Sequence, residues 1–199
     1  MDKYSILKQY YGHSAFRAGQ EALIDAILSG RDALCVMPTG GGKSLCYQIP
    51  ALPAITLVGS TLISLMKDQV AALKSAGVPA AYINSSLTGE QIRTVYARTR
   101  KGAYKLIYVA PERLETNSFL SLMQEMNVSF LAVDEAHCIS QWGQDFRPSY
   151  LGIVDFINAL PRRPIVAAYT ATATKQVQSD ILRLLQLQSP YRIVTGFDR

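Results

Sequence analysis

Residues 37–44, Met-Pro-Thr-Gly-Gly-Gly-Lys-Ser, contain the residue types that bind the phosphates of a nucleotide. Backbone N–H groups of successive glycines can form an anion-binding nest, and the N-terminus of a following helix adds partial positive charge. Lys43 supplies a cation for the β- and γ-phosphates, and the Ser44 hydroxyl suits a Mg²⁺ ion. The segment is typical of a Walker A loop with Met37 in the place of the first glycine. Its predicted ATP-binding residues are Thr39, Gly40, Gly41, Gly42, Lys43 and Ser44.

An acidic pair, Asp134 and Glu135, suits the second half of such a site. It lies 91 positions after Lys43 and directly follows the apolar residues 130–133. In a Walker B element, Asp134 would hold Mg²⁺ directly or through water, and Glu135 would orient and polarise the attacking water. The simpler alternative, two carboxylates that cap a helix, does not explain the Walker A loop. The sequence therefore predicts ATP hydrolysis, with Lys43, Asp134 and Glu135 as catalytic residues and with Ser44 and Asp134 as Mg²⁺ ligands.

Other enzymes that use a Walker A loop fit this sequence less well. A GTPase would need a guanine-reading Asn-Lys-x-Asp, which the sequence lacks. A small-molecule kinase would need an acceptor pocket and a lid, and no segment predicts them. Residues 134–137, Asp-Glu-Ala-His, are typical of helicase-like ATPases, so we expect DNA or RNA as the second ligand.

Composition indicates one globular domain, because the 199 residues are 49% hydrophobic and 18% charged. The sequence begins without an apolar signal core and contains no run of membrane-spanning length. We therefore expect no membrane partner. Three cysteines without CxxC spacing favour a reducing compartment, the cytoplasm, over a zinc site or a disulfide framework. A net charge of +5 permits a polyanionic ligand.

Short apolar runs and helical patterns alternate along the chain. Since the strands are apolar on both faces, they predict a parallel sheet covered by helices on both sides. The polar motifs follow strands, at the carboxyl ends where open α/β sheets bind ligands. The predicted strands are 33–36, 54–58, 80–83, 104–109, 129–133, 165–169 and 191–194. The predicted helices are 3–11, 20–29, 43–50, 62–77, 88–101, 118–126, 151–160 and 175–187, and we interpret the basic residues of 88–101 as a solvated face.

Residues 138–150, Cys-Ile-Ser-Gln-Trp-Gly-Gln-Asp-Phe-Arg-Pro-Ser-Tyr, closely resemble the aromatic-rich loop of RecQ-family DNA helicases. The resemblance covers almost the whole chain. Segments 16–20, 37–44, 60–70, 108–113 and 170–174 are similar to motifs 0, I, Ia, Ib and III of that family. The resemblance implies a RecA-like P-loop NTPase domain of three layers, with residues 1–199 forming a single ATP-binding helicase domain.

The resemblance also implies roles that spacing alone leaves open. From spacing, a Gln and an Arg ahead of a Walker A loop either read an adenine edge or cap a helix. In RecQ helicases the residues matching Gln20 and Arg17 would contact adenine and phosphate, and His13 would stack on the base. Trp142 and its neighbours would couple single-stranded DNA to the ATP site, since an aromatic face stacks on any base, whereas outside the family such residues are more often core. The implied DNA-binding or coupling residues are His137, Trp142, Phe146, Arg147, Ser64, Thr170 and Thr172.

Two positions depart from the family pattern. Gln144 stands where the family usually has His, which affects any proton-dependent part of the coupling. Thr61 replaces a usual Pro and restores a backbone N–H donor. RecQ helicases continue into a second RecA-like domain with an arginine finger, then zinc-binding and winged-helix regions. We therefore expect this chain to be the first motor domain of a longer protein.

The leading hypothesis is the nucleotide-binding lobe of an ATP-dependent 3′-to-5′ DNA helicase in repair and recombination. It would bind single-stranded and partially duplex DNA, and would be cytoplasmic, or nucleoid-associated in a bacterium. One alternative is a DEAD-box RNA-dependent ATPase, which would have Asp in place of His137 and leaves Trp142 unexplained. Another is a catalytically silent docking domain, which the retained Walker residues do not favour.

Overall fold

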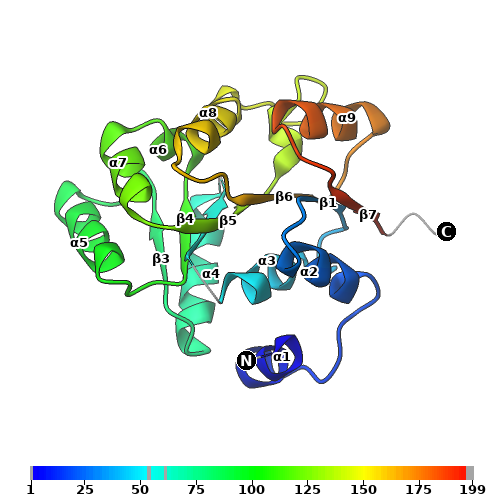
Figure 1. Cartoon of the computed structure of the whole chain (residues 1–199), viewed down its shortest axis with the longest axis horizontal. Helices are drawn as coiled ribbons and strands as arrows, with labels where there is room; N and C mark the ends of the chain where they lie inside the picture. Colours follow the sequence, from blue (N-terminus) through cyan, green and yellow to red (C-terminus); the bar gives the residue numbers. More distant parts are fainter. Residues whose placement is uncertain (1, 53–54, 61, 196–199) are drawn as a thin grey trace.

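In the computed structural model, which describes residues 2–52, 55–60 and 62–195, strands and helices alternate along most of the chain (Figure 1). The strands are β1 (Ala33–Val36), β2 (Ile55–Gly59), β3 (Ala80–Ile83), β4 (Leu106–Val109), β5 (Val128–Val133), β6 (Ile165–Thr170) and β7 (Tyr191–Val194). The helices are α1 (Lys3–Tyr11), α2 (Gln20–Leu28), α3 (Lys43–Ala51), α4 (Ile63–Ser75), α5 (Gly89–Arg100), α6 (Pro111–Leu114), α7 (Asn117–Glu125), α8 (Gly152–Ala159) and α9 (Lys175–Leu184), with the 3₁₀ helices η1 (Ala136–Ile139) and η2 (Pro148–Tyr150).

Within the described residues the strands form one seven-stranded sheet in the order β3-β4-β2-β5-β6-β1-β7, and all its pairs are parallel. Successive strand side chains point to opposite faces, so Leu34 and Val36 enter one core cluster and Ala33 and Cys35 the other. Helices α2, α3 and α4 pack on one face, and α5, α7, α8 and α9 on the other. This confirms the predicted three-layer α/β fold.

Helix α1 lies outside these layers, against α2 and α3 (Figure 1). Ile6 and Leu7 pack there on Ile24 and Ile49. Asp2 caps the start of α1, and Gly12 ends it in a left-handed conformation with φ of 69°. Among the described residues, no helix is long and apolar enough to cross a membrane.

The boundaries differ from the predictions in a few places. Leu62 was expected on the buried face of its helix, but it is 44% exposed and immediately precedes α4. The last helix ends at Leu184, before the expected 187, because the chain turns through a left-handed Gln186. Proline is favoured at the first position of a helix. Pro111 begins the short helix α6, which we did not predict. Positions 54 and 61 of the predictions, Ala54 and Thr61, lie outside the described residues.

A buried ion pair joins the amino end of the sheet to the segment after α9. Asp32 is 2% exposed and accepts two hydrogen bonds from the Arg163 guanidinium, at 3.1 and 2.6 Å. It also accepts backbone N–H bonds from Val166 at 2.9 Å and Gln188 at 2.7 Å. The Asp32 carboxylate therefore joins the start of β1 to two distant segments. Val166 lies 134 positions further along the chain, and Gln188 lies 156 positions further.

We expect Asp32→Ala to lower the free energy of unfolding by about 3 kcal/mol, because it leaves a guanidinium and two backbone donors without their acceptor. Urea unfolding of the purified chain measures this change. Asp68→Ala, at an exposed position of α4, is the matched control and should stay within about 0.5 kcal/mol of the original. A loss below about 1 kcal/mol for Asp32→Ala would show that the cluster contributes little net stability.

Candidate active site

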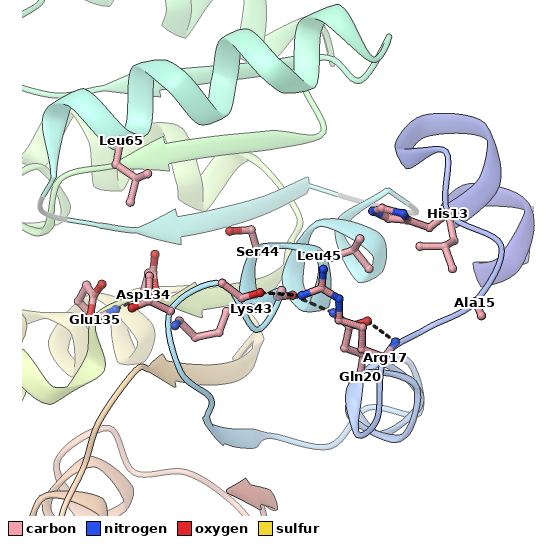
Figure 2. Close-up of a pocket in the computed structure, with 14 residues that line it drawn as sticks. His13, Ala15, Arg17, Gln20, Lys43, Ser44, Leu45, Leu65, Asp134 and Glu135 are labelled. Carbon is pink, nitrogen blue, oxygen red and sulfur yellow. Dashed lines mark hydrogen bonds between the residues drawn. The ribbon is translucent and has the colours of Figure 1, made fainter. Parts of the chain in front are cut away.

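A cavity of about 400 Å³ lies where β1 and β5 end, and the residues predicted from the Walker motifs meet in it (Figure 2). Lys43 and Ser44 come from the start of α3, and Asp134 and Glu135 follow β5. The predicted residues that line it are His13, Arg17, Gln20, Thr39, Gly40, Gly42, Lys43, Ser44, Asp134 and Glu135. Figure 2 shows the acidic pair at one end and His13 at the other.

Four apolar side chains also line this cavity, and the sequence analysis did not identify them. They are Leu7, Ala15, Leu45 and Leu65. Leu7 and Ala15 come from α1 and the segment after it, whose packing on α3 the helical pattern alone could not show. The cavity is therefore apolar as well as charged, as expected for a site that binds both a base and phosphates.

The Met37 side chain packs tightly against the glycine loop. The Met37 side chain is buried, and a Cβ on Gly41 would lie 2.5 Å from Met37 Cγ and 2.9 Å from the Pro38 carbonyl oxygen. Gly40 and Gly42 have φ of 79° and 88°, which other residues rarely adopt. The Met37 side chain, which stands in place of the first glycine of the motif, therefore packs directly against Gly41. The positive φ of Gly40 and Gly42 allows the sharp turns of the loop.

Gly41 differs from the other glycines of this loop. Its N–H donates to the Pro38 carbonyl at 3.0 Å, and Gly41 does not line the cavity, so its contact with phosphate stays a prediction. The Lys43 ammonium donates to the Met37 carbonyl at 2.8 Å. It lies across the cavity floor toward Asp134, as Figure 2 shows.

Gln20 and Arg17 brace the glycine loop. Gln20 is 4% exposed; its amide oxygen accepts from the Arg17 N–H at 2.8 Å, and its amide nitrogen donates to the Gly42 carbonyl at 3.2 Å. The Arg17 guanidinium donates to the Gly40 carbonyl at 2.7 Å. Spacing left adenine reading and helix capping open; these contacts show that the pair fixes the loop in place. His13 is exposed at the outer end of the cavity.

Asp134 is a buried carboxylate with a raised pKa. It is 7% exposed, and its pKa rises from 3.8 to about 6, chiefly because burial disfavours the charged form and secondly because of the Glu135 charge. Its Oδ1 accepts from the Glu135 N–H at 3.0 Å, and its backbone carbonyl accepts from the Tyr150 hydroxyl at 2.9 Å. A divalent cation would offset the burial of this charge, so the site fits Mg²⁺ with the Ser44 hydroxyl as a second oxygen donor.

We expect Asp134→Asn to stabilise the nucleotide-free chain by up to about 3 kcal/mol at pH 8. The folded pKa lies above the ordinary value of 3.8, so ionisation costs stability only in the folded state. That cost is absent below about pH 4 and complete above about pH 6, so wild-type stability falls relative to the variant as the pH rises through this window. Urea unfolding of both proteins at pH 5 and pH 8 tests this. Equal stabilities at pH 8 would contradict it, and Asp68→Asn is the control.

Glu135, His137 and Thr170 form a chain of contacts from the acidic pair to the end of β6. His137 Nδ1 lies 2.9 Å from the Thr170 hydroxyl and 3.4 Å from a Glu135 carboxylate oxygen. The Thr170 hydroxyl donates to the Thr172 carbonyl at 2.9 Å. It therefore accepts from His137, which assigns the ring proton to Nδ1. Since β6 lies between β1 and β5, Thr170 occupies the position between the glycine loop and the acidic pair.

Thr170 was predicted as a DNA-binding or coupling residue, and it is fully buried. Of these two roles its burial favours coupling, which stays a prediction. Thr172 is exposed, as is Ser64 at the start of α4. Along this edge of the sheet, Thr170 is therefore buried, whereas Thr172 and Ser64 are open to solvent.

The aromatic loop between η1 and η2 projects Trp142 into solvent. Trp142 is 75% exposed, so the alternative of a core residue is excluded for it. Phe146 and Arg147 are half-buried, and the Arg147 guanidinium pairs with Asp145 at 2.8 and 3.0 Å. Gln144 is exposed. A small cavity of about 100 Å³ is lined by His137, Trp142, Gly143, Gln144, Thr172, Ala173, Thr174 and Val177, which brings the loop together with the residues after β6.

Comparisons with known proteins show which family the chain belongs to. Residues 17–180 match the DEAD/DEAH box helicase family model. The chain is 49% identical over 198 residues to the ATP-dependent DNA helicase RecQ of Bacillus subtilis and 52% identical over 197 residues to that of Haemophilus influenzae. Each alignment covers 98% of this chain and 34% or 32% of the relative, so the chain spans about a third of their length. Among solved structures, the DUF1998 helicase MrfA bound to DNA aligns over 98% of this chain and 28% of its own, with a TM-score of 0.78 and 15% identity, which shows the shared fold.

Proposed function

Because the chain belongs to the DEAD/DEAH box helicase family, we propose that it is the ATP-binding lobe of a RecQ-type DNA helicase. It binds ATP with Mg²⁺ and couples hydrolysis to movement along single-stranded DNA and to unwinding of partially duplex DNA. The similarity to ATP-dependent DNA helicases RecQ of two bacteria supports a DNA substrate. The 3′-to-5′ direction and the role in repair and recombination are proposed from the resemblance of the sequence motifs to that family. We propose that the protein is cytoplasmic, and nucleoid-associated if its source is a bacterium.

The cavity residues divide the work of binding ATP. The glycine loop and the N-terminus of α3 attract the phosphates, and Lys43 neutralises their charge. Asp134 and Ser44 would hold Mg²⁺, which stabilises developing phosphate charge when bound. Glu135 accepts a proton from the attacking water. Arg17 and Gln20 hold the loop, with the adenine between their segment and His13.

The observation that carries the coupling is the contact chain from Glu135 through His137 to Thr170, with the exposed Trp142 beside it. A base stacked on Trp142 would lie beside the segment that holds His137. A shift of His137 would then change its contact with the Glu135 carboxylate. The chain spans about a third of the length of the RecQ helicases it resembles, so the proposal includes a second RecA-like domain that carries an arginine finger as a partner. Such a finger contributes about 10³–10⁵ in rate, and we expect the chain alone to hydrolyse ATP slowly.

Trp142→Ala in the full-length native protein tests this proposal. We expect the concentration of single-stranded DNA needed for half-maximal ATPase stimulation to rise about tenfold, since base stacking on an aromatic ring is worth about 1–3 kcal/mol. ATP turnover is measured against DNA concentration, with Leu28→Ala, another exposed apolar position, as the control. Unchanged stimulation by DNA would contradict the coupling role. Stronger stimulation by RNA than by DNA would favour an RNA-dependent ATPase instead.

A further inference from the structure

The exposed Trp142 is held in position through its backbone. Its indole is largely in solvent, so side-chain packing contributes little to its placement. Its backbone N–H donates to the Ser140 hydroxyl at 3.1 Å. Ser140 itself is fully buried at the end of η1, so the residue that anchors Trp142 belongs to the interior of the domain.

The Ser140 hydroxyl is oriented by Asp180, a residue of α9 that lies 40 positions away. The hydroxyl donates to Asp180 Oδ2 at 2.7 Å, and this leaves its oxygen lone pairs to accept from the Trp142 N–H. Asp180 is 6% exposed, and its other oxygen accepts from the Arg183 guanidinium at 3.0 Å and from the Gln176 amide at 3.5 Å. Its pKa is lowered, first by the Ser140 hydrogen bond and then by Arg183. The carboxylate is therefore ionised and fixed to its own helix while it holds Ser140.

The turn that carries Trp142 has little freedom to shift. The Gly143 N–H donates to the Ser140 carbonyl at 2.9 Å, and a Cβ on Gly143 would collide with the backbone of His137. At its other end the loop is tied by the Arg147 N–H, which donates to the Cys138 carbonyl at 2.8 Å. The Ser140–Asp180 bond is the side-chain link from this turn to α9, the helix that follows the Thr170–Thr174 segment.

We propose that Asp180 is a positioning residue that sets Trp142 for DNA by way of Ser140. The anchor follows from the contacts above, whereas its consequence for DNA rests on the proposed function. Because the anchor begins on α9, a movement of the segment after β6 on ATP binding would be passed to Trp142. Neither Ser140 nor Asp180 lines the cavity proposed for ATP, so their effect is expected on the use of DNA and not on the affinity for ATP.

The chain contains a single tryptophan, so its intrinsic fluorescence reports on this loop alone. We expect Ser140→Ala and Asp180→Ala each to lower the anisotropy of Trp142 by allowing faster nanosecond motion of the loop. The double variant should show no further loss, because both changes break one link. Asp180→Asn keeps an oxygen acceptor for the Ser140 hydroxyl and should restore wild-type anisotropy. Ser179→Ala, at an exposed neighbouring position of α9, is the control.

Three results would overturn the anchor. They are wild-type anisotropy in both alanine variants, additive losses in the double variant, and Asp180→Asn as mobile as Asp180→Ala. Thermal unfolding of each variant supplies the check on folding, and Ser140→Ala, which removes one buried oxygen, carries the test if Asp180→Ala does not fold.

The functional arm uses the full-length native protein. We expect Ser140→Ala and Asp180→Ala to raise the DNA concentration for half-maximal ATPase stimulation by at most about tenfold, the effect of removing the stacking indole itself. The KM for ATP should stay within about twofold of wild type. An unchanged DNA requirement alongside lowered anisotropy would overturn the positioning role. If the wild-type protein itself showed no stimulation by DNA, the proposed function would fail while the anisotropy result still decided the anchor.

Discussion

Lys43→Ala is expected to weaken ATP·Mg²⁺ binding about 100-fold while leaving the domain folded. Lys43 is the first residue of α3, and its side chain extends through the cavity toward Asp134 (Figure 2). A charge-assisted hydrogen bond is worth about 1.5–3 kcal/mol, and the lysine can contact both the β- and γ-phosphates. Titration of the purified chain with a fluorescent ATP analogue measures the affinity directly.

The folded state should tolerate this change because Lys43 makes one hydrogen bond there, to the Met37 carbonyl at 2.8 Å. Its loss costs about 1 kcal/mol, which corresponds to a fall in Tm of a few degrees. Lys67→Ala, at an exposed position of α4, removes the same charge away from the cavity and should keep wild-type affinity. An affinity of Lys43→Ala within threefold of wild type would remove the glycine loop from the nucleotide site.

Much of the fold and of the site could be predicted because both are encoded in short segments. The apolar run 130–133 followed by Asp134 and Glu135 predicts a buried strand and a polar end in the same six residues. A parallel sheet brings such strand ends to one edge, so the glycine loop and the acidic pair were expected to meet, and they do. Neither step required knowledge of which strands are neighbours.

The strand order could not be predicted in this way. Strands β1 and β2 are consecutive in the chain, yet β5 and β6 lie between them. This order depends on contacts between segments more than 100 residues apart, such as Asp32 with Arg163 and Val166. The position of Thr170 between the two Walker elements depends on it, so only the resemblance to a family indicated that this residue acts with the site.

Hydrogen bonds from side chains to distant backbone were missed for the same reason, even where the residue itself was predicted. Gln20 contacts the Gly42 carbonyl, and a side chain on Gly42 would collide with that amide. Spacing shows a Gln ahead of a glycine loop, but it does not show that the two are in contact. Likewise, Tyr150 was noted only as the end of the aromatic loop, although its hydroxyl donates to the Asp134 carbonyl. Such contacts depend on the packed structure and leave no local pattern.

The residue whose chemistry the structure defines most sharply is Glu135. Its backbone is left-handed, with φ of 48° and ψ of 41°, a conformation that costs a residue other than glycine about 1–3 kcal/mol. The sharp turn it makes after β5 directs its carboxylate into the cavity beside Asp134 (Figure 2). One oxygen of this carboxylate lies 3.4 Å from His137 Nδ1. Backbone strain at a residue that lines a cavity is expected where placement of the side chain matters for function.

Glu135→Gln should therefore lower the kcat for ATP hydrolysis by about 10²–10⁴-fold, the usual contribution of a general base. The amide has nearly the same shape, so the left-handed turn and the contact with the His137 ring are retained, and the affinity for ATP should stay within a few-fold of wild type. Both quantities are measured on the full-length native protein with saturating DNA. Glu112→Gln, in α6 outside the cavity, controls for the loss of a carboxylate near the same edge of the sheet. A kcat reduced less than tenfold would mean that another group accepts the proton, and it would leave Glu135 as a residue that only orients His137.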